Sequence, residues 1–264
     1  MKHAFRVMLS TAAIFIALGI AHSVQTDVLA GSFSSSKEDL QKQEEMQAAS
    51  ALMKLGVPLQ RDSRGIVRWI EAAKGEMSND AMQYLPRLSQ LEWLEIGGGG
   101  VSPSGMEYLK GCSSLRRLYV HDIRLEGDKL TWLSSLQKLE ALSLQRTGID
   151  GKVLKNLAAT STLTVLNLSG NNIEDKDMDD VAQIKGLEVL GLADTKITGA
   201  GIAKLEGMKR LNELNLMNCA ITDSDIESFM FMPNLRIVYA RGCNLGDMAV
   251  QSVVARFPML AIFR

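Results

Sequence analysis

Apolar residues recur along most of this chain at a fixed spacing of 24 residues. Successive units open on the pattern Leu-x-x-Leu-x-Leu, in which other apolar residues replace some of the later leucines. The first position of the unit is occupied by Leu91, Leu115, Leu139, Leu163, Leu187, Leu211 and Leu235. A fixed period in this range indicates a stacked repeat architecture, because one unit is too small to bury its own apolar face.

Each unit continues from a strand into a turn and then into helical spacing. Leu130, Leu133 and Leu136 recur every third residue, which indicates a short helix with one buried stripe. Ser102 followed by Pro103 supplies a helix cap and then a proline at the first helical position. At the ninth position, inside the bend after the strand, we expect a small side chain that bonds backbone groups. The residues at this position are Gly99, Ile123, Thr147, Asn171, Thr195, Cys219 and Cys243.

These elements predict an α/β fold: a right-handed solenoid with a curved parallel sheet on the concave side and short helices on the convex side. Crossovers between parallel strands are right-handed, and helices are wider than strands, so the stack bends toward the sheet. The pattern begins one period before Leu91, at Val67. We therefore expect eight repeats over residues 67–258.

The repeated pattern resembles that of bacterial leucine-rich-repeat proteins with a 24-residue unit. Their turn, similar to Ile-Thr-Asp-x-Gly-Leu, has its nearest forms here at residues 197–202 and 221–226. The resemblance covers roughly three quarters of the chain, and it specifies the fold much more closely than the partner. It implies that a protein partner binds the concave sheet.

The first residues have the layout of a secretory signal peptide. Lys2 and Arg6 precede an apolar run over residues 7–21, and Ala21-His22-Ser23 has the layout of a cleavage site. We assign residues 1–23 to this signal and expect export to the periplasm or the extracellular space. Cleavage after Ala30 is an alternative. An uncleaved membrane anchor is another, although the run is shorter than the ~20 residues that a spanning helix needs.

Three further segments flank the repeats. Residues 24–36 have the composition of a flexible tether. Ser36 and Asp39 have capping-box spacing at the start of a helix, and Gly56 suits its end, so residues 37–66 are expected to form an N-terminal cap. Residues 259–264 are an apolar terminal strand. It either completes the sheet or pairs end to end with a second copy in a homodimer.

Composition and charge argue against several classes of chemistry. The net charge is −1, which gives no electrostatic basis for binding nucleic acid or an anionic membrane surface. Beyond the signal region the histidine is His121, and no Cys-x-x-Cys spacing occurs. Strand alternation is expected to point His121 and its neighbour Asp122 to opposite faces. We expect no catalytic residue, no metal and no cofactor, and we predict that the chain is not an enzyme.

Two of the three cysteines could form a disulfide. Cys219 and Cys243 are one period apart, so their Cα atoms should lie within the ~4.4–6.8 Å that a disulfide requires. Buried free thiols are the favoured interpretation, because cysteine packs well at such positions. Cys112 falls in an apolar column and is expected in the core.

The concave face carries the candidate binding residues. Positions three and five of each strand should project there, since successive strand residues alternate faces. The candidate anchors are Trp69, Trp93, Arg116, Arg117, Tyr119, His121, Tyr239 and Arg241. Trp, Tyr and Arg are enriched at interface hot spots. The alternative is that Trp69 and Trp93 only cover the first layers of the core.

The function that these observations favour is an exported leucine-rich-repeat module that binds a macromolecular partner on the concave sheet. Two alternatives remain: a structural envelope protein that assembles with itself, and a substrate-binding adaptor for an enzyme complex.

Overall fold

A computed structural model describes residues 36–125, 130–157 and 160–264. The chain divides into two compact units, Met1–Asp39 and Leu40–Arg264. The predicted signal peptide and residues 24–35 of the predicted tether lie outside the described residues, so both assignments stay predictions. The sheet and the repeats lie in the second unit.

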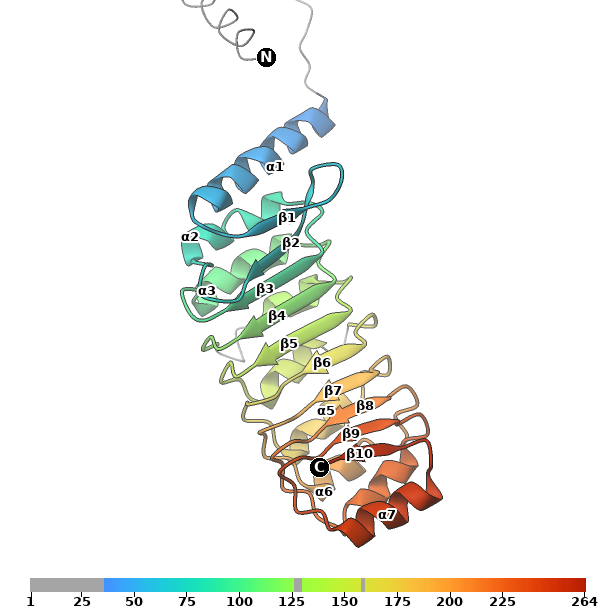
Figure 1. Cartoon of the computed structure of the whole chain (residues 1–264). Coiled ribbons are helices and arrows are strands. Elements are labelled where there is room, and N and C mark those ends of the chain that lie inside the picture. Colours follow the sequence, from blue (N-terminus) through green and yellow to red (C-terminus); the bar gives the residue numbers. More distant parts are fainter. Residues whose placement is uncertain (1–35, 126–129, 158–159) are drawn as a thin grey trace, which may run out of the picture. The chain divides into compact units, whose positions relative to one another are not determined.

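Within the described residues, the second unit is built on one 10-stranded sheet whose strands follow one another in sequence order (Figure 1). The strands are β1 (Leu59–Arg61), β2 (Val67–Ala72), β3 (Trp93–Gly97), β4 (Arg117–His121), β5 (Ala141–Gln145), β6 (Val165–Asn167), β7 (Val189–Gly191), β8 (Glu213–Asn215), β9 (Ile237–Tyr239) and β10 (Ala261–Phe263). From β2 to β10 all neighbours are parallel, and each residue lies beside the one 24 positions later. The predicted solenoid fold is confirmed.

The first strand differs from the others because it runs antiparallel to β2. A tight turn joins the two strands, and a short connection of this kind can only link antiparallel neighbours. The carboxylate Oδ1 of Asp62 accepts the backbone N–H groups of Arg64 (2.9 Å) and Ile66 (3.1 Å). Gly65 adopts a positive φ of 79°, which a residue with a side chain rarely adopts.

Short helices return the chain on the other side of the sheet. The α-helices described are α1 (Lys37–Lys54), α2 (Asn79–Met82), α3 (Pro103–Met106), α4 (Leu154–Leu157), α5 (Met178–Val181), α6 (Gly199–Ala203) and α7 (Asp247–Arg256). Short 3₁₀ helices accompany them at Leu85–Arg87, Glu107–Gly111, Thr131–Ser135, Gly151–Val153, Asp175–Asp177 and Ile226–Phe231. Ser102 caps α3 as expected: its side chain accepts the N–H of Gly105, and Pro103 occupies the first turn.

The helix α1 begins directly after Ser36. The Ser36 hydroxyl accepts the Asp39 N–H (3.1 Å), and the Asp39 carboxylate accepts the Ser36 N–H (3.2 Å). Ala48 and Leu52 are buried, whereas Leu40 is half exposed. The assignment of residues 37–66 as a cap, and the other segment boundaries, stay predictions.

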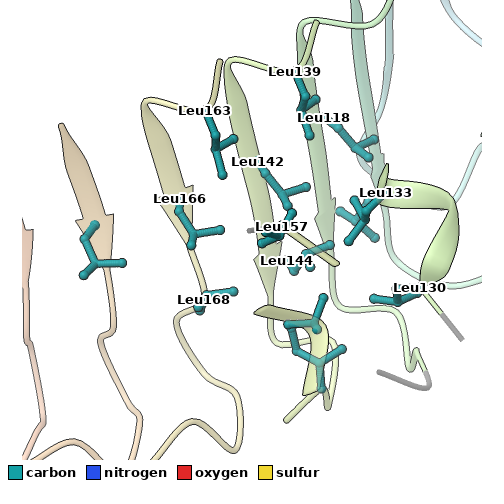
Figure 2. Close-up of a cluster of buried hydrophobic side chains, with 14 of the residues drawn as sticks. Leu118, Leu130, Leu133, Leu139, Leu142, Leu144, Leu157, Leu163, Leu166 and Leu168 are labelled. Carbon is teal, nitrogen blue, oxygen red and sulfur yellow. The ribbon is translucent and has the colours of Figure 1, made fainter. Parts of the chain in front are cut away.

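The repeated leucines share one interior. Leu139, Leu142 and Leu144 of one unit are fully buried, and so are their equivalents in the next unit, Leu163 and Leu166. Figure 2 shows them side by side, with leucines from the returning segments closing the space behind the strands. Each buried leucine contributes about 1.5–3 kcal/mol relative to an exposed one, which explains why the apolar columns determine the fold.

Polar side chains at the ninth position bond the backbone inside the bend, as predicted. The Nδ2 of Asn171 donates to the carbonyl oxygens of Leu144 (2.6 Å) and Leu168 (2.9 Å). Its Oδ1 accepts the N–H groups of Thr147 (3.0 Å) and Ile149 (3.3 Å). One side chain thus ties two adjacent units together.

The cysteines at the same position serve a similar role as free thiols. The thiol of Cys219 donates to the carbonyl oxygen of Leu192, and that of Cys243 donates to the carbonyl oxygen of Leu216, each at 3.1 Å. These contacts explain why thiols are accommodated at this turn without a disulfide.

Candidate partner-binding surface

Aromatic side chains gather on the open face of the first parallel strands. Trp69 lies beside Trp93 in the strand register, and Trp93 packs edge-to-face on Tyr119, with ring centroids 5.9 Å apart. We call Trp69, Trp93 and Tyr119 the aromatic cluster. All three are partly exposed, and Arg117 beside them is exposed. The indole N–H of Trp93 is buried without a hydrogen-bond partner among the described residues, so this ring also covers part of the core.

Arg116 does not belong to the aromatic cluster. It precedes β4, and its Nη1 bonds the Oε1 of Glu140 at 2.5 Å. Both side chains are largely exposed, so this ion pair contributes only about 0–1 kcal/mol. Of the two adjacent arginines, Arg117 is therefore the one that lies on the same strand face as the aromatic cluster.

Tyr239 and Arg241 lie far from the aromatic cluster. Tyr239 is on β9, five strand spacings from Tyr119 on β4, which corresponds to ~24 Å. Its ring stacks on Phe263, with centroids 5.5 Å apart. Arg241 follows β9 and is exposed. The eight predicted anchors therefore do not form one patch.

Our argument that His121 and Asp122 point to opposite faces is wrong. The ring Nδ1 of His121 lies 3.0 Å from the Oδ2 of Asp122. Alternation of faces holds only while the backbone is extended, and Asp122 has a left-handed φ of 57°. This conformation ends the strand at Asp122 and turns its carboxylate back beside the imidazole.

The two residues belong to a chain of four charged or titratable groups. The Nε and Nη2 of Arg146 donate to the Asp122 carboxylate at 2.6 and 2.8 Å. These bonds, together with the contact to His121, hold the pKa of Asp122 well below its usual range. On the other side, the Nε2 of His121 lies 3.3 Å from the Oε1 of Glu95. The imidazole is thereby fixed between two carboxylates.

Sequence reasoning missed this arrangement, although the repeat contained a signal for it. From the unit that begins at Leu91 onward, the eighth position adopts a positive φ, at Gly98, Asp122, Arg146, Gly170, Asp194, Asn218 and Gly242. Glycine, asparagine and aspartate are the residues that tolerate this conformation best. Their recurrence in one column predicts a left-handed turn at the strand end.

A hollow of about 310 Å³ lies on the strand face next to the aromatic cluster. Its walls include Tyr119, His121 and Glu95 on one side and Glu213 and Asn215 on the other. Of the lining residues, the sequence predicts Tyr119 and His121 as candidate anchors and none from the middle strands β5, β6 and β7. The hollow exists because the residues of the middle strands, such as Ser143 and Gly191, are small.

Hydrogen bonds at the ends of β6 and β8 orient two amides that line this hollow. The Oδ1 of Asn167 accepts the N–H of Ser169 (3.0 Å), and the Oδ1 of Asn215 accepts the N–H of Met217 (3.1 Å). These bonds fix which amide atom is oxygen. Neither Nδ2 donates to a protein acceptor in the described part of the chain, so both donors are available to a ligand.

Metal-ligating clusters and membrane-spanning helices are both absent from residues 36–125, 130–157 and 160–264. No three His, Cys, Asp or Glu side chains there are grouped so that they could hold a metal ion. None of the helices there has both the length and the apolar character required to cross a membrane.

Comparison with known proteins agrees with this geometry. A family profile described as "Leucine Rich repeat" matches residues 160–182 and 209–230. No curated protein matches the chain. Among solved structures, internalin C2 from Listeria monocytogenes is similar with a TM-score of 0.55 and 23% identity, over 74% of this chain and 80% of that one. An internalin, inlF, from the same organism has a TM-score of 0.35 and 17% identity over 69% of each chain. The strand register and the two matched segments show that this chain has the leucine-rich-repeat fold.

Proposed function

We propose that this chain is an exported module that binds a protein partner on its concave sheet. The observation that carries the proposal is the position of the aromatic cluster directly beside the 310 Å³ hollow. Trp93 and Tyr119 offer rigid rings, and the hollow offers polar groups and a recess. This combination of aromatic anchors around a recess is typical of protein-binding hot spots. The repeat fold supplies the rigid platform.

Photocrosslinking from position 93 or 119 in the exporting cells tests this function. We expect a distinct protein to be captured, and we expect Trp93→Ala and Tyr119→Ala to weaken its binding while circular dichroism stays unchanged. Tyr108→Ala is the matched control, because Tyr108 is exposed but belongs to a returning segment. Equal capture by all variants would exclude the aromatic cluster as the binding surface.

Export rests on the predicted signal peptide, and its test is independent of the partner. Mass spectrometry of the protein from the cell envelope and from the medium should find an N-terminus at residue 24 or residue 31. An intact Met1 in the membrane fraction would instead indicate an uncleaved anchor. Full-length protein found only in the cytosol would contradict export.

Self-association through the last repeat is a second candidate function. Met248, Met259 and Phe263 are 79%, 70% and 54% exposed, and β10 forms the far edge of the described sheet. An unpaired edge beside apolar side chains favours strand pairing between copies. Sedimentation at increasing concentration should then show a dimer that Met259→Lys dissociates. A monomer at all concentrations would exclude this function.

A further inference from the structure

We propose that the hollow binds a lysine or arginine side chain of the partner protein, with Glu213 as its counter-ion. This inference rests on the proposed function and specifies the chemistry of the partner. The side chain would enter between β6 and β8, where small residues leave the sheet uncovered. The argument depends on the charge, the shape and the hydrogen-bonding groups of this region.

The charge of the hollow is negative. Glu95 and Glu213 are the acidic residues that line it, and neither lysine nor arginine lines it. Glu95 is already in contact with His121. Glu213 is half buried and forms no ion pair with any described residue. A partly buried carboxylate without a counter-ion attracts a cation more strongly than an exposed one, because solvent screens it less.

The shape next to Glu213 suits a long aliphatic stem. Val165, Val189 and Glu213 occupy the same register position on β6, β7 and β8. Two strand spacings, ~10 Å, separate the first from the last. A lysine or arginine stem can therefore lie across the two valines while its charged end reaches the carboxylate, which is how such side chains bury their methylene groups.

Gly191 leaves room for the side-chain amide of Asn167 beside this path. A Cβ placed at Gly191 would lie 2.5 Å from the Oδ1 of Asn167, so a larger residue would displace that amide. The free Nδ2 groups of Asn167 and Asn215 lie on either side of Gly191 in the register. They can donate to the carbonyl oxygens of the peptide that carries the basic side chain.

The test uses short peptides and NMR. The probe is acetyl-Ala-Ala-Lys-Ala-Ala-amide, and the controls replace lysine by norleucine, which keeps the stem, or by glutamate. We expect the lysine peptide to shift the backbone amides of Val189, Glu213 and Asn215 and the side-chain amides of Asn167 and Asn215. Norleucine should bind much more weakly, and glutamate should not bind.

Glu213→Gln should weaken the lysine peptide about tenfold, which is the loss expected when a charge-assisted hydrogen bond becomes neutral. Glu206→Gln is the matched control, because Glu206 is exposed outside the strands and its replacement changes the net charge equally. Equal binding of the lysine and norleucine peptides, or an equal loss in both variants, would overturn the inference. If the captured partner depends on Trp93 but not on Glu213, the proposed function stands and this inference fails. If no partner is captured while the peptide binds as expected, the hollow is a site for a basic side chain, and the proposed function fails.

Discussion

Replacing Asn171 by alanine should destabilise the protein strongly, because this one side chain bonds several buried backbone groups. The side chain is 5% exposed and bonds the backbone of two units. Without it, the N–H groups of Thr147 and Ile149 and the carbonyl of Leu168 lose the partner that the structure gives them. The carbonyl of Leu144 keeps a bond from the Thr147 hydroxyl (2.7 Å).

The magnitude follows from these three orphaned groups. Each buried polar group left without a partner costs about 1–3 kcal/mol, and neighbouring losses do not add fully. We therefore expect the free energy of unfolding to fall by about 3–5 kcal/mol. For a folded unit of this size, such a loss corresponds to a decrease in melting temperature of roughly 10 °C.

Urea unfolding followed by circular dichroism measures this loss, and hydrogen exchange at the amides of Thr147 and Ile149 locates it. Asn172→Ala is the matched control: the neighbouring side chain is exposed, and its loss should change stability by less than ~0.5 kcal/mol. The reasoning is refuted if Asn171→Ala costs less than ~1 kcal/mol, or if the two amides exchange no faster than in the control.

Four further predictions concern Asp122, the cysteines and a turn glycine. Arg146→Gln should raise the pKa of Asp122 toward its ordinary ~3.9, because Arg146 is the main cause of its lowered value. The lowered pKa contributes stability above the unfolded-state pKa, and this contribution is lost as pH falls through the folded-state pKa. An NMR titration that finds the same Asp122 pKa in both proteins would disprove the assignment. Burial raises the pKa of the Cys112 thiol to about 12, so iodoacetamide should alkylate half-buried Cys243 well before Cys112. Denatured, unreduced protein should titrate three thiols, and a single thiol would reveal a Cys219–Cys243 disulfide. Gly100→Ala should lower the melting temperature more than Gly99→Ala: both have a positive φ, but only at Gly100 would a Cβ meet the Met77 carbonyl oxygen, at 2.5 Å. Equal melting temperatures would show that this clash relaxes.

The repeat period predicts some of the contacts between residues of neighbouring units but not others. Once the period is known, Arg116 must lie near Glu140, and Tyr239 must lie five strands from Tyr119. The contact between Asp122 and Arg146 also joins residues one period apart. The orientation of Asp122 toward His121 could not be predicted in this way. Side chains alternate between faces only where the backbone is extended, and Asp122 has a left-handed conformation.

The sequence by itself determined the stacked sheet, since apolar columns at a constant spacing can be buried only when each unit covers the next. It also determined the side chains that bond the backbone at the ninth position. Only the tertiary structure decided where the strand face is hollow, and which carboxylate and amide groups there have no partner among the described residues. These properties depend on the side-chain directions and turn conformations of several adjacent units together, and no single unit specifies them.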